Sequence, residues 1–252
     1  MKHLVLAICG VAMIGCSGEK AKAPEKPEAP EYFKVDAATA GNIKGIVDFV
    51  GKRPAVKPIS MDAEAACEQL HNKPVDGSSF AVGKDGGLAN VFVYIKSGLE
   101  GKAFEPPKEA VILDQRGCMF VPRVIALQAQ QTLTVRNSDP VSHNIHPNPQ
   151  NNREWNQQQS PGAPDLVRRF ARPEVMIPVK CNVHSWMRSY IGVLDHPYLA
   201  VTSENGEFAW TAVPPGSYTI AAWHETFGEL TENIKVSKGA DSAVKFTFHS
   251  TR

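Results

Sequence analysis

The feature that most restricts the fold of this chain is a series of short apolar or alternating runs, each closed by a turn signal. The turn signals include Asp85-Gly86-Gly87, Pro106-Pro107 and Pro214-Pro215-Gly216, and the 252 residues hold 19 glycines and 19 prolines. Runs of this length and spacing are typical of β-sandwiches. The predicted strands are Ile43–Val50, Ala89–Lys96, Ala110–Leu113, Arg123–Leu127, Thr132–Arg136, Val175–Lys180, Tyr190–Leu194, Glu207–Thr211, Tyr218–Trp223, Glu232–Val236 and Ala243–Phe248. Only Ala63–Leu70 has the pattern of a helical turn, so we predict an all-β protein.

The composition excludes several classes of protein. Hydrophobic residues make up 42% of the chain, which is too high for a disordered protein. The formal net charge is +1 and no basic block is present, so we expect no nucleic-acid partner. Motifs of the kind G-x-S-x-G or H-E-x-x-H and phosphate-binding glycine loops are missing from the sequence, so we expect no enzyme.

The N-terminus has the pattern of an export signal. A basic start is followed by the apolar run Leu4–Gly15 and then by Cys16. Met13-Ile14-Gly15-Cys16 resembles the bacterial lipobox, although leucine is usual where Met13 stands, and this resemblance implies a lipid on Cys16. Ser17 after the cysteine implies sorting to the outer membrane. We therefore expect a periplasmic protein of the bacterial cell envelope, bound to the membrane by its lipid anchor only; the alternative is ordinary signal cleavage nearby.

Composition divides the chain into five segments. Residues 1–16 form the predicted signal, and residues 17–41 are a tether rich in Lys, Glu and Pro. A β segment, a first sandwich and a second sandwich follow at 42–107, 108–197 and 198–252. Val201–Tyr218 resembles the second half of carboxypeptidase-regulatory or transthyretin-like (prealbumin/Ig-like) domains. Such domains begin with strands like those before residue 98, so 42–98 and 198–252 could instead form one domain that contains the first sandwich as an insertion.

One short segment concentrates metal-binding side chains. Cys181-Asn182-Val183-His184-Ser185-Trp186-Met187 offers a thiolate, an imidazole and a thioether. It follows a predicted strand in which Val175, Ile177, Val179 and Cys181 share one face. Asn137 through Pro147 (NSDPVSHNIHP) brings His143 to the end of another strand. One cysteine and two histidines with a weak axial methionine are the ligands of a blue copper electron-transfer site.

These two motifs resemble those of cupredoxins, and in particular the short-loop amicyanin type with its C-x-x-H-x-x-M spacing. The resemblance covers about 90 of the 252 residues and implies a Greek-key β-sandwich that binds one type 1 copper. It implies His143, Cys181, His184 and Met187 as ligands, and Asn144 as the side chain that ties the two ligand loops together. Val175–Lys180 lacks the aromatic residue that is common before the cysteine in this family. By the same resemblance, His184 should be partly exposed, with Trp186 in the apolar ring where a redox partner docks.

The cysteine count leaves three thiols in the folded part, namely Cys67, Cys118 and Cys181. An oxidising compartment favours pairing, and a Cys67–Cys118 bridge leaves Cys181 for the metal. Alternatives remain open: Cys181 could pair with either of the others, or Cys67, His71 and Cys118 could form a second metal site. His146 could replace His143 as a ligand, and Met187 could be a core residue.

The sequence thus predicts an exported copper protein that carries single electrons. The resemblance implies partners such as c-type cytochromes or a dehydrogenase. The first rival is a lipoprotein that binds or delivers copper without carrying electrons. The second rival is a carbohydrate- or protein-binding module built on 198–252. Four aromatic side chains of this segment could stack on sugars or could instead fill the core: Phe208, Trp210, Tyr218 and Trp223.

Overall fold

The computed structural model describes residues 31–55, 58–77 and 80–250, and these are almost entirely strand, turn and loop. The predicted signal, Cys16 and most of the predicted tether lie outside the described residues. The strands are β1 (Gly41–Val50), β2 (Phe92–Ser97), β3 (Val111–Gln115), β4 (Phe120–Val121), β5 (Val124–Gln128), β6 (Leu133–Asn137), β7 (His143–Pro147), β8 (Gln157–Gln159), β9 (Leu166–Arg168), β10 (Glu174–Lys180), β11 (Arg188–Leu194), β12 (Leu199–Val201), β13 (Glu207–Val213), β14 (Gly216–His224), β15 (Gly228–Val236) and β16 (Asp241–His249). The one helix of the described part, α1, spans Ala65–Glu68 within the predicted Ala63–Leu70. The predicted all-β fold class is confirmed.

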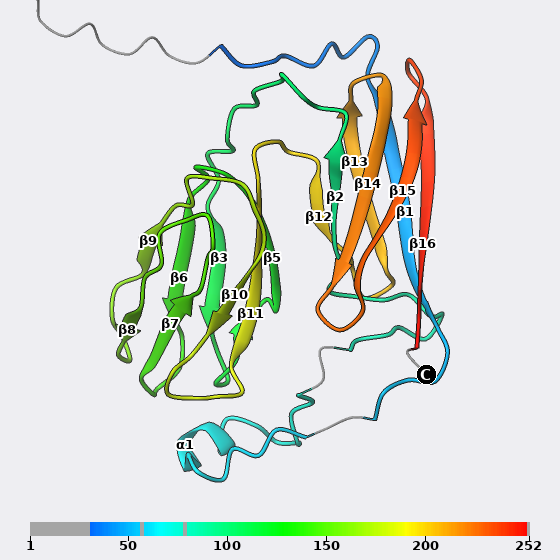
Figure 1. Ribbon diagram of the computed structural model, residues 1–252. Helices are drawn as coiled ribbons and strands as arrows, with labels where there is room; N and C mark the ends of the chain where they lie inside the picture. Colours follow the sequence, from blue (N-terminus) through cyan, green and yellow to red (C-terminus); the bar gives the residue numbers. More distant parts are fainter. Residues whose placement is uncertain (1–30, 56–57, 78–79, 251–252) are drawn as a thin grey trace, which may run out of the picture. The chain divides into compact units, whose positions relative to one another are not determined.

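The first sandwich consists of two sheets around one apolar core (Figure 1). One sheet has the order β5-β11-β10-β7-β8 and the other β4-β3-β6-β9. Most neighbours are antiparallel, but β3 runs parallel to β6 and β5 runs parallel to β11. Leu133, Val135 and Asn137 all point inward from β6, as the alternation of that strand predicts.

Strands from both ends of the described chain form the second pair of sheets. β1 lies between β13 and β16, and Figure 1 shows the blue strand β1 beside the red strand β16. The other sheet has the order β12-β2-β14-β15, so β2 also pairs with strands from the C-terminal part. Residues before and after the first sandwich therefore share two sheets and one apolar core.

The alternation predicted for the strand before Cys181 fails at Val175. Ile177, Val179 and Cys181 are buried as predicted, but the Val175 side chain is exposed. The register of β10 against β11 shifts between Glu174 and Ile177, and Met176 has a positive φ of 61°. An extra residue in one strand reverses which face the residues before it occupy. The bulge therefore turns Val175 outward and leaves Cys181 in phase with the core.

Among the described residues, no helix is both long enough and apolar enough to cross a membrane.

Candidate metal centre

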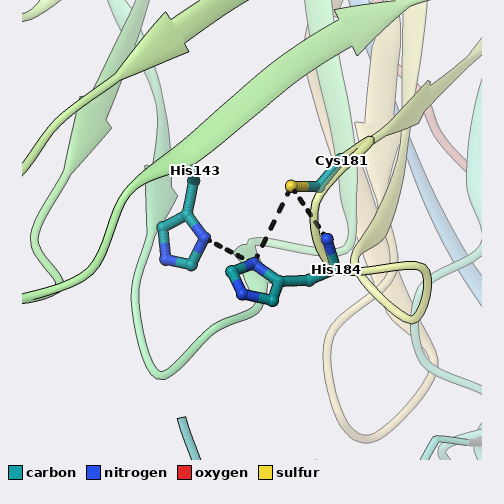
Figure 2. Close-up of side chains that lie close together, drawn as sticks. All are labelled: His143, Cys181 and His184. Atoms are coloured by element: carbon teal, nitrogen blue, oxygen red, sulfur yellow. Dashed lines mark hydrogen bonds between the residues drawn. The ribbon is translucent and has the colours of Figure 1, made fainter. Parts of the chain in front are cut away.

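Three buried side chains from two segments converge at one end of the first sandwich (Figure 2). His143 begins β7, while Cys181 and His184 lie in the loop between β10 and β11. His143 Nδ1 is 2.9 Å from His184 Nδ1, and Cys181 Sγ is 3.9 Å from His184 Nδ1. His143 is fully buried, and Cys181 and His184 are each 3% exposed. The structure thus brings together three of the four predicted ligands through their donor atoms.

The ligand loop is held closed by its own backbone. The Cys181 amide donates to the carbonyl oxygen of Met187 at 3.2 Å, and the Met187 amide donates to the carbonyl oxygen of His184 at 3.0 Å. The His184 amide donates to Cys181 Sγ at 3.4 Å, which is drawn in Figure 2. Met187, the fourth predicted ligand, is fully buried in the core beside this loop.

Asn144 links the two ligand segments. Its Oδ1 accepts from the Asn182 amide at 2.6 Å and lies 3.3 Å from Cys181 Sγ, which donates to it as a thiol. Its Nδ2 donates to Asn156 Oδ1 at 2.7 Å. A side chain held at both ends fixes the separation of the segments that carry His143 and Cys181.

Asp139 orients His143 from the far side of the imidazole ring, a role that was not predicted from the sequence. Its Oδ2 is 2.8 Å from His143 Nε2, and its carboxylate also accepts from the amides of Gly117 and Cys118 at 2.6 and 2.7 Å. A carboxylate on the far nitrogen of a metal-binding histidine fixes the ring and its tautomer. Only the four-residue separation of Asp139 from His143 could have indicated this contact.

Contacts within the site and burial shift the pKa values of the three donors in different directions. Burial raises the pKa of Cys181, but interactions with His143 and nearby backbone groups outweigh burial and lower that pKa below its usual value. Burial lowers the pKa of His143, but the contacts with Asp139 and Cys181 prevail and raise it. Burial and the charge on His143 both lower the pKa of His184.

The donor set fits a single soft metal ion. Bonds of about 2.0 Å to nitrogen and about 2.3 Å to sulfur place ligand atoms roughly 3 to 4 Å apart around one ion. The donor atoms of His143, Cys181 and His184 all lie within 4.8 Å of one another. The two Nδ1 atoms lie 2.9 Å apart, close enough to bind the same cation. Two imidazoles and a thiolate are the donors that copper accepts in both oxidation states.

The predicted disulfide between Cys67 and Cys118 is present, which leaves Cys181 as a free, buried thiol. Cys118, Asp139 and His143 also lie close together, but the Cys118 sulfur is part of the bridge. The alternative metal site of Cys67, His71 and Cys118 is contradicted for the same reason. Instead, His71 Nε2 donates to the carbonyl oxygen of Gly117 at 2.7 Å.

The predicted exposure of His184 is wrong. Its Nε2 lies 3.7 Å from Cys67 Sγ, and the Trp186 ring lies 5.1 Å from its own ring. His184 is buried because the Cys67–Cys118 disulfide holds α1 against its ring. Trp186 is half-buried and its indole donates to the carbonyl oxygen of Cys118 at 3.0 Å, so it belongs to this cover. The part of the cover formed by Cys67 and Cys118 has no signal in the ligand motif, because these residues come from a distant part of the chain.

His146 lies apart from the three donors. Its ring contacts Asn182 Oδ1 at 3.3 Å and Glu154 Oε1 at 2.5 Å, on the outer side of β7. Extended backbone turns residues three apart to opposite faces, which separates His146 from His143.

A family model described as polysaccharide lyase family 4, domain II matches residues 170–244. The match includes β10 and β11 of the first sandwich as well as β12 to β15. It is a different family from the transthyretin-like one that the sequence resembles. No curated protein matches the chain.

Several solved structures are similar over part of the chain. A copper-containing nitrite reductase from Thermus scotoductus is 19% identical, with a TM-score of 0.32 over 39% of this chain, and the match spans only 25% of the reductase. A reduced amicyanin variant is 16% identical, with a TM-score of 0.30 over 40% of this chain and 97% of amicyanin. A purple cupredoxin from Nitrosopumilus maritimus is 20% identical, with a TM-score of 0.26 over 30% of this chain and 81% of the cupredoxin. The case for a metal therefore rests on the side chains of this protein alone.

Proposed function

We propose that this protein binds one copper ion and carries single electrons between redox partners. The observation that carries the proposal is the convergence of His143 Nδ1, Cys181 Sγ and His184 Nδ1 in a buried site. Copper held there would supply a one-electron couple between Cu(II) and Cu(I). Met187, which is buried beside the loop, would be the fourth ligand.

The residues around the site support fast electron exchange by limiting movement. Asn144 fixes the ligand segments to each other, Asp139 fixes the ring of His143, and the loop from Cys181 to Met187 is closed by backbone hydrogen bonds. Because these contacts hold the ligand residues in place, the same geometry can serve both oxidation states. Burial of the donors also excludes water, which would otherwise reorganise when the charge changes.

The proposal extends to the location and partners of the protein. Leu4–Gly15 and Cys16 support export and lipid attachment at the bacterial cell envelope, with c-type cytochromes or a dehydrogenase as the class of partner. Mass spectrometry of the membrane fraction should find Cys16 lipidated. An unmodified N-terminus beyond residue 16 would contradict the anchoring.

Absorption spectroscopy and voltammetry of the copper-loaded protein test the central claim. The parent should show an intense visible band from the thiolate–copper bond and a reversible couple. Cys181→Ser should stay folded and lose the band, whereas Val183→Ala, a change of an exposed residue in the same loop, should keep it. A parent that binds no copper, or an unchanged spectrum for Cys181→Ser, would refute the proposal. A band without a reversible couple would favour copper delivery.

The second rival, a carbohydrate-binding face on 198–252, finds no support in the side chains that prompted it. Phe208, Trp210 and Tyr218 are buried in the core of the second pair of sheets, and Trp223 is half-buried. Sugar stacking requires exposed rings. The transthyretin-like character of this region stays a proposal based on Val201–Tyr218.

A further inference from the structure

Both imidazole ligands are closed off from solvent at their outer edges. His143 is fully buried and its Nε2 is occupied by Asp139. His184 is 3% exposed, and its Nε2 faces the disulfide sulfur of Cys67. A docking partner therefore meets neither imidazole directly in this structure.

The third ligand, Cys181, is also only 3% exposed, but it lines a surface cleft. A cleft of about 280 Å³ has Cys181 among its lining residues, together with Lys180, Ser185, Arg188 and Tyr190. The lining comes from β10, the ligand loop and β11, with Asn148 after β7. Because Cys181 itself lines the cleft, a molecule bound there contacts the residue that carries the thiolate.

The cleft carries positive charge. Lys180 and Arg188 are directly opposite each other in the register of β10 and β11, and both are exposed. None of the residues that line the cleft is acidic. In the part of the chain that the structure describes, neither cation forms an ion pair. Two unpaired cations at a concave surface attract anions and increase their rate of association.

We propose that the redox partner docks over this cleft through an acidic surface, and that the electron passes through Cys181 rather than His184. This inference rests on the proposed electron-transfer function. In the step, the reduced centre loses one electron and the oxidised centre of the acidic redox protein gains it; no bond is made or broken and no proton moves. Lys180 and Arg188 are docking residues and do not touch the metal.

The first test needs neither metal nor electron transfer. Metal-free protein is titrated with hexacyanochromate(III), a redox-stable paramagnetic trianion, and amide NMR line broadening locates the bound anion. We expect broadening centred on Lys180 and Arg188 in the parent, and its loss in the double variant Lys180→Glu/Arg188→Glu. Lys235→Glu/Lys238→Glu is the matched control, since it changes exposed lysines on and after β15 and alters the net charge equally. Broadening centred on Trp186 or His71, or equal broadening in both variants, would overturn the docking site.

The second test measures the rate. Copper-loaded reduced protein is mixed with hexacyanoferrate(III) at low ionic strength. Charge reversal at Lys180 and Arg188 should slow oxidation about tenfold or more, and the difference should shrink as salt screens the charges. The control variant should keep most of the parent rate. Equal rates in the two variants would overturn the proposed exit, while absence of a copper couple would count against the proposed function and leave the NMR result standing.

Discussion

The disulfide between Cys67 and Cys118 permits a quantitative prediction of stability. The two cysteines are 51 residues apart, and both are fully buried. The chain-entropy relation for a closed loop of this length gives about 4 kcal/mol of stabilisation, because the bridge restricts the unfolded chain. The double variant Cys67→Ala/Cys118→Ala should lose about this amount, which corresponds to a fall of roughly 8–16 °C in Tm for a domain of this size.

Urea unfolding of the metal-free protein, followed by circular dichroism, measures both the loss and its cause. If the bridge acts on the unfolded state, its removal lets that state expand, and the m value should rise along with the loss of stability. The parent treated with a reductant under unfolding conditions is the matched control and should behave like the variant. A loss below about 1 kcal/mol, or a full loss with an unchanged m value, would refute the reasoning from chain entropy.

Three further predictions concern single residues. Asn144→Ala removes the acceptor of the Asn182 amide, so the free energy of unfolding should fall by about 1–3 kcal/mol. Copper binding, measured by competition with a chelator, should weaken about 10- to 100-fold. An unchanged copper affinity would show that the two ligand segments hold together without Asn144. Met187→Leu should keep copper but raise the potential in voltammetry, because a weak donor to Cu(II) is lost; a lower potential would exclude Met187 as a ligand. His196 is buried and neutral, with Nε2 donating to the carbonyl oxygen of Ile95 and Nδ1 accepting from the Tyr198 amide, and burial lowers its pKa. Because the unfolded state protonates His196 more readily than the folded state does, stability should fall as the pH drops below about 6.5. His196→Gln should therefore make the urea midpoint depend less on pH below about 6.5. An equal dependence of the midpoint on pH in the parent and the variant would contradict this prediction.

Local patterns in the sequence predicted most of the strands. The strands at Ile43–Val50, Thr132–Arg136 and Tyr218–Trp223 were predicted from alternation and turn residues, and each is present as β1, β6 and β14. Short strands without such a pattern, including β8 and β9, were not predicted. They are strands only because they pair with β7 and β6, and this pairing is not visible in the local sequence. The bulge at Met176 was also invisible, since it depends on how β10 registers against β11.

For the candidate site, the sequence by itself determined the donors: the spacing of Cys181, His184 and Met187, with His143 after a separate strand, is a local chemical pattern. Only the tertiary structure decided what surrounds them. A four-residue separation is the only sequence signal for the contact of Asp139 with His143, and the contact of Cys67 with His184 has no signal in the motif. The exposure of a ligand depends on which distant segment covers it. Here a disulfide between residues 51 positions apart covers His184, while Cys181 lines a surface cleft.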